Sequence, residues 1–150
     1  MSTTPEPATA QPARARGRGI GNVLITVYAI LAIGATSRAL FQMFTEFGVA
    51  PVSITLSAVS GVIYILATVA LILNGRTWYR VAWVTISIEL LGVIVIGTLS
   101  LVVPSIFADK NSVWSYYGLG YVFIPLVLPV LGMLWLRRRG AALRAEQPGV

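Results

Sequence analysis

Four long apolar runs constrain the fold of this chain more than any motif does. The runs cover residues 20–40, 52–73, 81–103 and 118–136. Each has roughly the 20 apolar residues that an α-helix needs to cross a bilayer. Hydrophobic residues make up 57% of the chain and charged residues only 11%, which is far from the usual composition of soluble proteins. The sequence therefore predicts an all-α fold, a single bundle of four transmembrane helices in an integral membrane protein.

The segments outside these runs are short and basic. Residues 1–19 are rich in Pro, Ala and Thr and lack apolar periodicity, so we predict a disordered cytoplasmic tail. Residues 20–136 then form the transmembrane domain, and residues 137–150 form a second short basic tail, which can briefly extend the last helix. Arginines followed by an apolar core are also typical of a cleavable signal peptide. Renewed apolar character at 39–41 favours a retained first helix.

Most of the cations lie on one side of the predicted bundle. Nine of the 11 Lys and Arg residues fall before the first run, between the second and third, or after the fourth: Arg14, Arg16, Arg18, Arg76, Arg80, Arg137, Arg138, Arg139 and Arg144. Because short loops rich in Lys and Arg stay inside, we predict a bacterial plasma-membrane protein with both termini cytoplasmic. The cations also predict attraction to anionic lipid head groups, worth about 1 kcal/mol each. They flank helices and form no groove with interleaved aromatics, so they do not indicate nucleic-acid binding.

The residue types present limit the chemistry. The chain contains no His and no Cys, so the usual zinc ligands, thiolates and disulfides are all missing from its side chains. A lone buried carboxylate without a His, a Cys or a second close acid provides no recognisable general acid–base pair. We therefore predict no metal site, no cofactor and no enzymatic activity.

Glu89 is the one carboxylate inside an apolar run. Such a group costs about 2 to 4 kcal/mol in hydrocarbon by insertion scales, which makes it a functional hypothesis. At about 1.5 Å of rise per residue, Glu89 lies near the middle of its helix, and Tyr28, Tyr64 and Thr68 reach similar depths. We predict that these hydroxyls are its partners in an intramembrane polar site. Burial without a nearby cation favours the neutral carboxyl, which can donate a hydrogen bond.

Two helix faces carry small and polar residues at helical spacing. Ser53, Ser57, Ser60 and Gly61 lie on the face of the second run that also carries Tyr64, and Thr85 and Gly92 lie on the Glu89 face of the third. We predict that these two faces pack together and hide Glu89 from lipid, with Gly92 allowing close approach. Glu89 is then either a hydrogen-bonding strut, a contact for a partner helix, or a proton or cation site. For the serines, an ordinary packing surface is the simpler interpretation.

The predicted outer side has few charges and several aromatics. Arg38 would extend to lipid phosphate or pair with Glu46, and Trp114 would anchor the loop 104–117 in the outer interface. Pro125 and Pro129, inside the fourth run, predict a bend. Bent helices line substrate paths in transporters, but they are also common in ordinary membrane bundles.

Three segments resemble a known group of proteins: 18–23 (Arg-Gly-Ile-Gly-Asn-Val), 79–83 (Tyr-Arg-Val-Ala-Trp) and 113–128. They look like small, uncharacterised four-helix membrane proteins of actinobacteria, including mycobacteria, a resemblance that implies the fold and no activity. The small multidrug resistance family is similar in size, in helix number and in having one embedded Glu. That family places its proton-coupled Glu in the first helix, where this sequence has Tyr28, so no residue role is transferred.

These observations predict a non-enzymatic accessory or scaffold subunit that associates with a larger membrane or envelope complex. Its contacts would be another membrane protein or further copies of itself. The alternative is a small oligomeric proton-coupled transporter or channel that uses Glu89. Glu89→Gln separates the two, because it keeps size and hydrogen bonding but removes titration.

Overall fold

The protein is all-helical over the residues that the computed structural model describes, 12–107 and 111–145, and this part contains no strand. Its elements are α1 (Pro12–Thr45), α2 (Pro51–Ile72), α3 (Arg76–Val102), the short 3-10 helices η1 (Pro104–Phe107) and η2 (Ser115–Tyr121), and α4 (Ile124–Ala145). The predicted all-α fold is confirmed.

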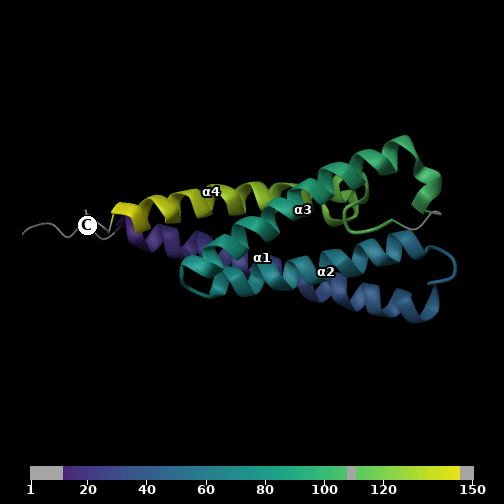
Figure 1. Ribbon diagram of the computed structural model, residues 1–150, viewed down its shortest axis with the longest axis horizontal. Helices are drawn as coiled ribbons and strands as arrows, with labels where there is room; N and C mark the ends of the chain where they lie inside the picture. Colours follow the sequence, from purple (N-terminus) through teal and green to yellow (C-terminus); the bar gives the residue numbers. More distant parts are fainter. Residues whose placement is uncertain (1–11, 108–110, 146–150) are drawn as a thin grey trace, which may run out of the picture.

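Successive long helices run in opposite directions (Figure 1). The start of α1, the α2–α3 turn and the end of α4 lie toward one end of the bundle, and the α1–α2 turn and the end of α3 lie toward the other. Three segments are each long and apolar enough to cross a membrane: Gly19–Thr45, Pro51–Ile72 and Arg76–Val102. A bent pair, η2 with the first part of α4, would add a fourth. This architecture is compatible with a multi-pass membrane protein.

The first and last helices extend beyond the predicted apolar runs, α1 at its start and α4 at its end. α1 begins at Pro12, so the predicted disorder is wrong for residues 12–19, and residues 1–11 lie outside the described part. Proline suits the first position of a helix, and the Ala and Arg residues that follow have high helix propensity. For the same reason α4 continues through the arginines at 137–139 to Ala145.

The fourth apolar run is not one straight helix from residue 118. α4 begins at Ile124, and the preceding η2 meets it at an angle of 97°. Val122 and Phe123, at the break, both have positive φ. The bend therefore precedes Pro125, which lies in the first turn of α4, where a missing N–H costs no helical hydrogen bond. Only Pro129 lies inside the helix.

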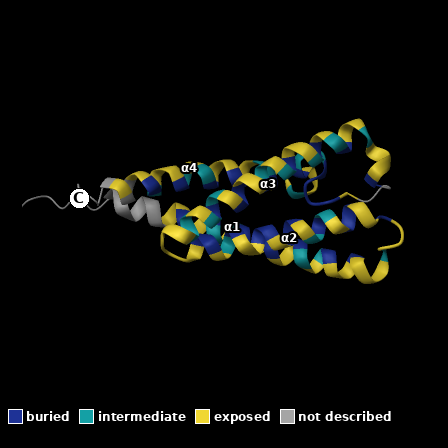
Figure 2. Cartoon of the chain, in the orientation of Figure 1, coloured by how far each residue is buried: buried dark blue, intermediate teal, exposed yellow. Residues whose placement is uncertain are grey.

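Glycines bring the helices close together along the core. A Cβ at Gly61 of α2 would lie 2.9 Å from Thr36 Oγ1 of α1, and a Cβ at Gly21 of α1 would lie 2.8 Å from Trp135 Cζ2 of α4. The predicted contact of Gly61 with the third helix is thus wrong, because its close neighbour is α1. Buried residues face inward on all four helices, and the outer faces are mostly exposed and apolar (Figure 2).

Candidate functional site

Glu89 lies at the middle of α3 and is completely buried, with 0% of its surface exposed. It is equally distant in sequence from Arg76 and Val102, the two ends of α3, which places it about 20 Å from each along the axis. Tyr28, near the middle of α1, donates a hydrogen bond from its Oη to Glu89 Oε2 over 2.7 Å. The contact between Tyr28 and Glu89 that helix depth predicted is therefore present.

The other carboxyl oxygen has no such partner. Glu89 Oε1 is buried and makes no hydrogen bond within the described part of the chain. An ionised carboxylate accepts at both oxygens, and a protonated one has a proton to donate. In either state one hydrogen-bond donor or acceptor of Glu89 stays unpaired. A buried polar group that is left unpaired costs about 1 to 3 kcal/mol.

Two more aromatic side chains complete the surroundings of this pair. The Tyr64 ring of α2 lies 6.3 Å from the Tyr28 ring, between centroids, and is fully buried. Its Oη accepts a hydrogen bond of 3.0 Å from Trp114 Nε1. Glu89, Tyr28, Tyr64 and Trp114, which we call the Glu89 cluster, thus come from three helices and one connecting segment.

The last helix approaches the same point through a small residue. A Cβ at Gly132 of α4 would lie 3.6 Å from Tyr28 Oη and 3.1 Å from Ile86 Cδ1 of α3. A Cβ at Gly132 would thus crowd Ile86 and lie in ordinary van der Waals contact with the tyrosine that binds Glu89. All four long helices therefore meet at the Glu89 cluster.

Trp114 reaches the cluster because the chain folds back into the bundle after α3. Residues 111–123, the re-entrant segment, lie against the carboxy-terminal half of α3 (Figure 1). Trp114 is only 4% exposed, and its ring lies where a Cβ at Gly92 would be, 2.7 Å from Cζ3. Gly92 is ten residues from the end of α3, so the ring reaches about 15 Å into the bundle.

This placement corrects two predictions. Trp114 is not an anchor at the outer surface, because its indole is buried and hydrogen-bonded to Tyr64. Gly92 does not pack against the second helix, since the space beside it holds the Trp114 ring. The only sequence signal for the position of the Trp114 ring is Gly92 itself. A glycine there is consistent with contact either with the Trp114 ring or with the second helix.

The re-entrant segment is held to α3 by further contacts. The backbone N–H of Tyr116 donates to Ser100 Oγ over 2.7 Å, and the hydroxyls of Tyr117 and Thr98 lie 2.9 Å apart. A Cβ at Gly97 would meet the Tyr117 ring at 2.5 Å. Ser100 thus supplies a hydrogen bond to the segment, and Gly97 leaves room for the Tyr117 ring.

The hydroxyls on the predicted packing faces bind their own helices. Thr68 Oγ1 donates to Tyr64 O over 2.7 Å, so the predicted contact of Thr68 with Glu89 is wrong. The same pattern holds for three others: Ser57 to Ser53 O, Ser60 to Ser57 O and Thr85 to Val81 O. Ser53, Ser57, Ser60 and Thr85 are all buried. Such back-bonding satisfies a hydroxyl in apolar surroundings without a second helix.

Arg38 joins α1 to the re-entrant segment. Its Nη2 donates to Asn111 O over 2.7 Å, and longer contacts of 3.4 Å reach Tyr121 Oη and Gln42 Oε1. The guanidinium therefore binds the protein's own backbone, where the sequence predicted an extension to lipid phosphate or a pair with Glu46. Glu46 is half-buried in the turn after α1.

The groups at the Glu89 cluster can hold and exchange a proton and can bind a polar group through oxygen. Within residues 12–107 and 111–145, no three His, Cys, Asp or Glu side chains lie together as a metal site. Comparison of the chain with protein-family models, with curated proteins and with solved structures found no match.

Proposed function

We propose that this chain is a non-enzymatic, multi-pass protein of a bacterial plasma membrane, with both termini cytoplasmic, that serves as an accessory or scaffold subunit of a larger membrane complex. The observation that carries the proposal is the complete burial of Glu89 by its own chain, with Tyr28 as a hydrogen-bond donor. A polar group that is buried in this way influences how the helices of the bundle pack together. Buried polar networks of this kind make one helix arrangement more favourable than its alternatives.

This geometry also changes where a partner can bind. Sequence reasoning offered the Glu89 face and the serine face as partner contacts, but both are covered within the bundle. A partner protein, or a second copy of this chain, would therefore bind the exposed apolar outer faces. On α1 these include Ile30, Ile33 and Phe41, beside Gly34, where a Cβ would meet nothing within 4 Å.

The test is to purify the tagged, full-length protein from its native membrane in mild detergent and to measure its mass and composition by native mass spectrometry. We expect a larger membrane protein to co-purify in fixed ratio. Glu89→Gln should retain that partner, because the amide keeps hydrogen bonds to Tyr28 within reach. Recovery of a bare homo-oligomer, with no second protein, would contradict the accessory role.

A second function is favoured by one specific observation, the unpartnered Oε1 of Glu89. A buried oxygen with unused capacity can take up a proton or bind a cation, as the acid of a small oligomeric proton-coupled transporter or channel does. Proton flux into liposomes containing the purified protein tests this alternative. A carrier should lose flux in Glu89→Gln and keep its fold, whereas a scaffold should show no flux in either form.

A further inference from the structure

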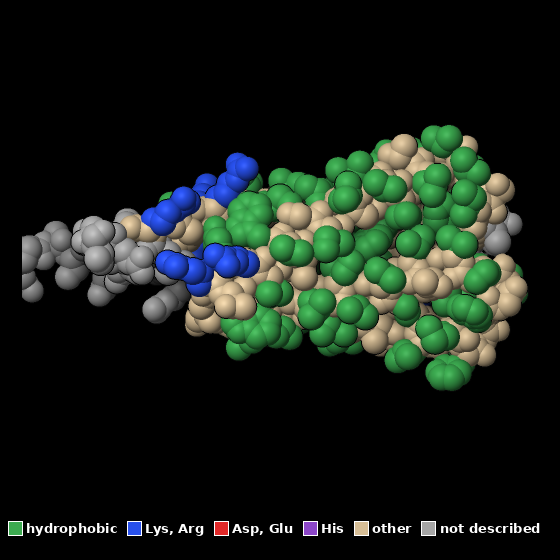
Figure 3. All heavy atoms as spheres, viewed as in Figure 1, with side chains coloured by type: hydrophobic (Ala, Val, Ile, Leu, Met, Phe, Trp, Pro, Cys, Tyr) green, Lys and Arg blue, Asp and Glu red, His purple; other side chains and the backbone are tan. Residues whose placement is uncertain are grey.

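A basic cavity lies at the end of the bundle where the arginines gather (Figure 3). It has a volume of about 740 Å³ and lies between the α2–α3 turn and the last turns of α4. Three arginines line it: Arg76 at the start of α3, and Arg139 and Arg144 on α4. The cavity is remote from the Glu89 cluster, and none of that cluster's residues lines it.

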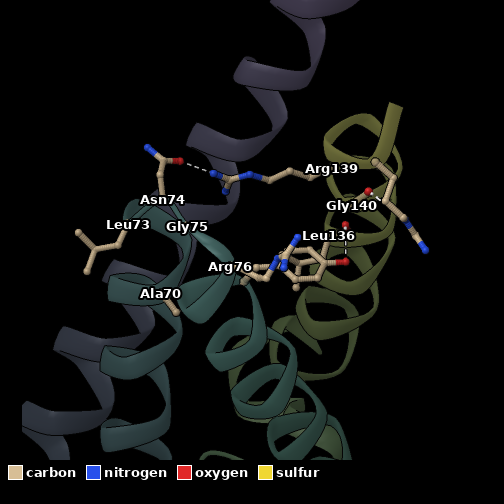
Figure 4. A pocket seen from close by; sticks show the side chains of 10 residues that line it. Ala70, Leu73, Asn74, Gly75, Arg76, Leu136, Arg139 and Gly140 are labelled. Carbon is tan, nitrogen blue, oxygen red and sulfur yellow. Dashed lines mark hydrogen bonds between the residues drawn. The ribbon is translucent and has the colours of Figure 1, made fainter. Parts of the chain in front are cut away.

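Arg139 is held across the cavity. Its guanidinium extends from α4 to Asn74 in the α2–α3 turn and donates a hydrogen bond to Asn74 Oδ1 (Figure 4). It also stacks over the Trp135 ring, 5.1 Å from the centroid. Because a guanidinium has five N–H donors, these contacts orient the group and leave other donors for a ligand. An oriented arginine loses less entropy on binding than a free one.

Little in the described structure neutralises this charge. The described acids are Glu46 and Glu89, and neither lines the cavity. α3 begins here with Gly75 at its N-cap, no side-chain cap and no acidic residue in its first turn. The first backbone N–H groups of a helix lack intrahelical partners and carry a partial positive charge. The positive charge of Arg76 and the partial positive charge at the start of α3 thus lie side by side at the cavity.

Part of the cavity lining is apolar, and we call this part the apolar wall. It consists of Ala70 of α2, Leu73 at the C-cap of α2, and Leu136 of α4. Leu73 is 39% exposed, so this wall continues onto the apolar outer surface of the bundle. A ligand that fits both the arginines and the apolar wall has an anionic head with a hydrocarbon body beside it.

We propose that this cavity binds the phosphate group of an anionic phospholipid, with Arg76 and Arg139 on the phosphate oxygens and the apolar wall beside the lipid's glycerol and acyl region. Arginine suits phosphate because its planar donors match two oxygens at once. The sequence predicted only a diffuse attraction between cations and the membrane surface. The cavity instead defines a discrete site, and it does not depend on the accessory role or on Glu89.

The test uses the full-length protein in phosphatidylcholine nanodiscs that contain a small fraction of phosphatidylglycerol. Native mass spectrometry counts the phosphatidylglycerol molecules that remain bound. Arg76→Gln should weaken binding by at least about tenfold, which corresponds to about 1.4 kcal/mol, because a charged hydrogen bond to the phosphate is lost. Arg138→Gln is the matched control because it removes the same charge. Arg138 is exposed on α4 and does not line the cavity.

Two further variants and a measurement of helical content separate a loss of lipid binding from a loss of folded structure. Arg139→Gln should weaken binding as Arg76→Gln does, but it also removes the contact with Asn74. Asn74→Ala removes that contact and keeps the arginine, so it should bind more lipid than Arg139→Gln does. Helical content by circular dichroism should be the same in all four variants.

Two results would overturn the proposal. Equal loss in Arg76→Gln and Arg138→Gln would show that binding follows net surface charge and needs no cavity. Displacement of the bound phosphatidylglycerol by inorganic phosphate at equal concentration would show that the site takes free phosphate and that the apolar wall contributes nothing. Retention of lipid against inorganic phosphate, together with selective loss in Arg76→Gln, supports the phospholipid site.

Discussion

The two helix pairs of this bundle are connected in different ways. α1 and α2 are joined by a turn of a few residues, and the two helices pack directly where Gly61 meets Thr36. α3 and α4 are separated by η1 and by the re-entrant segment, which contains η2 and places the Trp114 and Tyr117 rings over Gly92 and Gly97 of α3. A glycine on a helix face thus leaves room for close packing of either another helix or a connecting segment.

The second arrangement has a conformational cost that the first avoids. Four non-glycine residues in or beside η2 have positive φ: Tyr116, Tyr117, Val122 and Phe123. Each such conformation costs about 1 to 3 kcal/mol and persists only where surrounding contacts hold it. Here those contacts come from α3 and from Tyr64, so the re-entrant segment depends on the helices far more than the α1–α2 turn does.

The largest effect should come from removing the Trp114 side chain. Trp114→Ala should destabilise the protein by about 3 to 5 kcal/mol, because it leaves a cavity at Gly92 and removes the donor to Tyr64. Denaturing-detergent titration of the purified protein measures this change. Trp114→Phe keeps most of the volume and should cost much less. If Trp114→Ala unfolds at the same point as the native protein, the indole is not buried as described.

A smaller effect is expected from filling the seat of Tyr117. Gly97→Val should cost about 1 to 3 kcal/mol, because its Cβ would overlap the Tyr117 ring and backbone. Gly34→Val is the control, since Gly34 is on a helix surface with nothing within 4 Å of an added Cβ. Limited proteolysis should cut the re-entrant segment faster in Gly97→Val alone. Equal cleavage of both variants would argue against the contact.

Tyr28→Phe tests the polar contact at the junction of the two helix pairs. It should destabilise by about 1 to 2 kcal/mol, because Glu89 Oε2 loses its donor in a buried place. The double variant Tyr28→Phe with Glu89→Leu measures the coupling between the two side chains by a mutant cycle, because leucine cannot accept the tyrosine's hydrogen bond. Additive effects would mean that the hydrogen bond contributes no net stability.

The smallest effect is expected at Thr36, in the directly packed pair. Its Oγ1 is buried without a hydrogen-bond partner in the described part of the chain. Thr36→Val removes that hydroxyl at almost constant shape, so stability should stay within about 0.5 kcal/mol or rise. The same unfolding titration measures it. A loss above about 1 kcal/mol would mean that the hydroxyl has a partner after all.

Hydropathy and helix depth predicted the features that depend on regular helices. The positions of α2 and α3 agree with the apolar runs within a few residues, and equal depth placed Tyr28 beside Glu89. Both arguments assume straight helices that cross the membrane once. They succeed where the chain satisfies its backbone hydrogen bonds within each helix.

The same assumption explains the errors. Residues 118–123 are all apolar or glycine apart from Tyr121, so hydropathy cannot distinguish a turn from a helix there. Trp114 lies at a sequence position where interfacial anchors are common, and nothing local shows that its ring turns inward. Its burial depends on contacts with Gly92 and Tyr64, which are distant in sequence.

The re-entrant segment also constrains the order in which the protein can be assembled. In the membrane that we propose, backbone N–H and C=O groups without partners cannot remain exposed to lipid. Tyr116 N–H is paired with Ser100 of α3, and Trp114 is paired with Tyr64 of α2, so the segment has these partners only once α2 and α3 are both in place. We therefore expect the segment, and α4 behind it in the chain, to dock onto a bundle in which α2 and α3 already pack together.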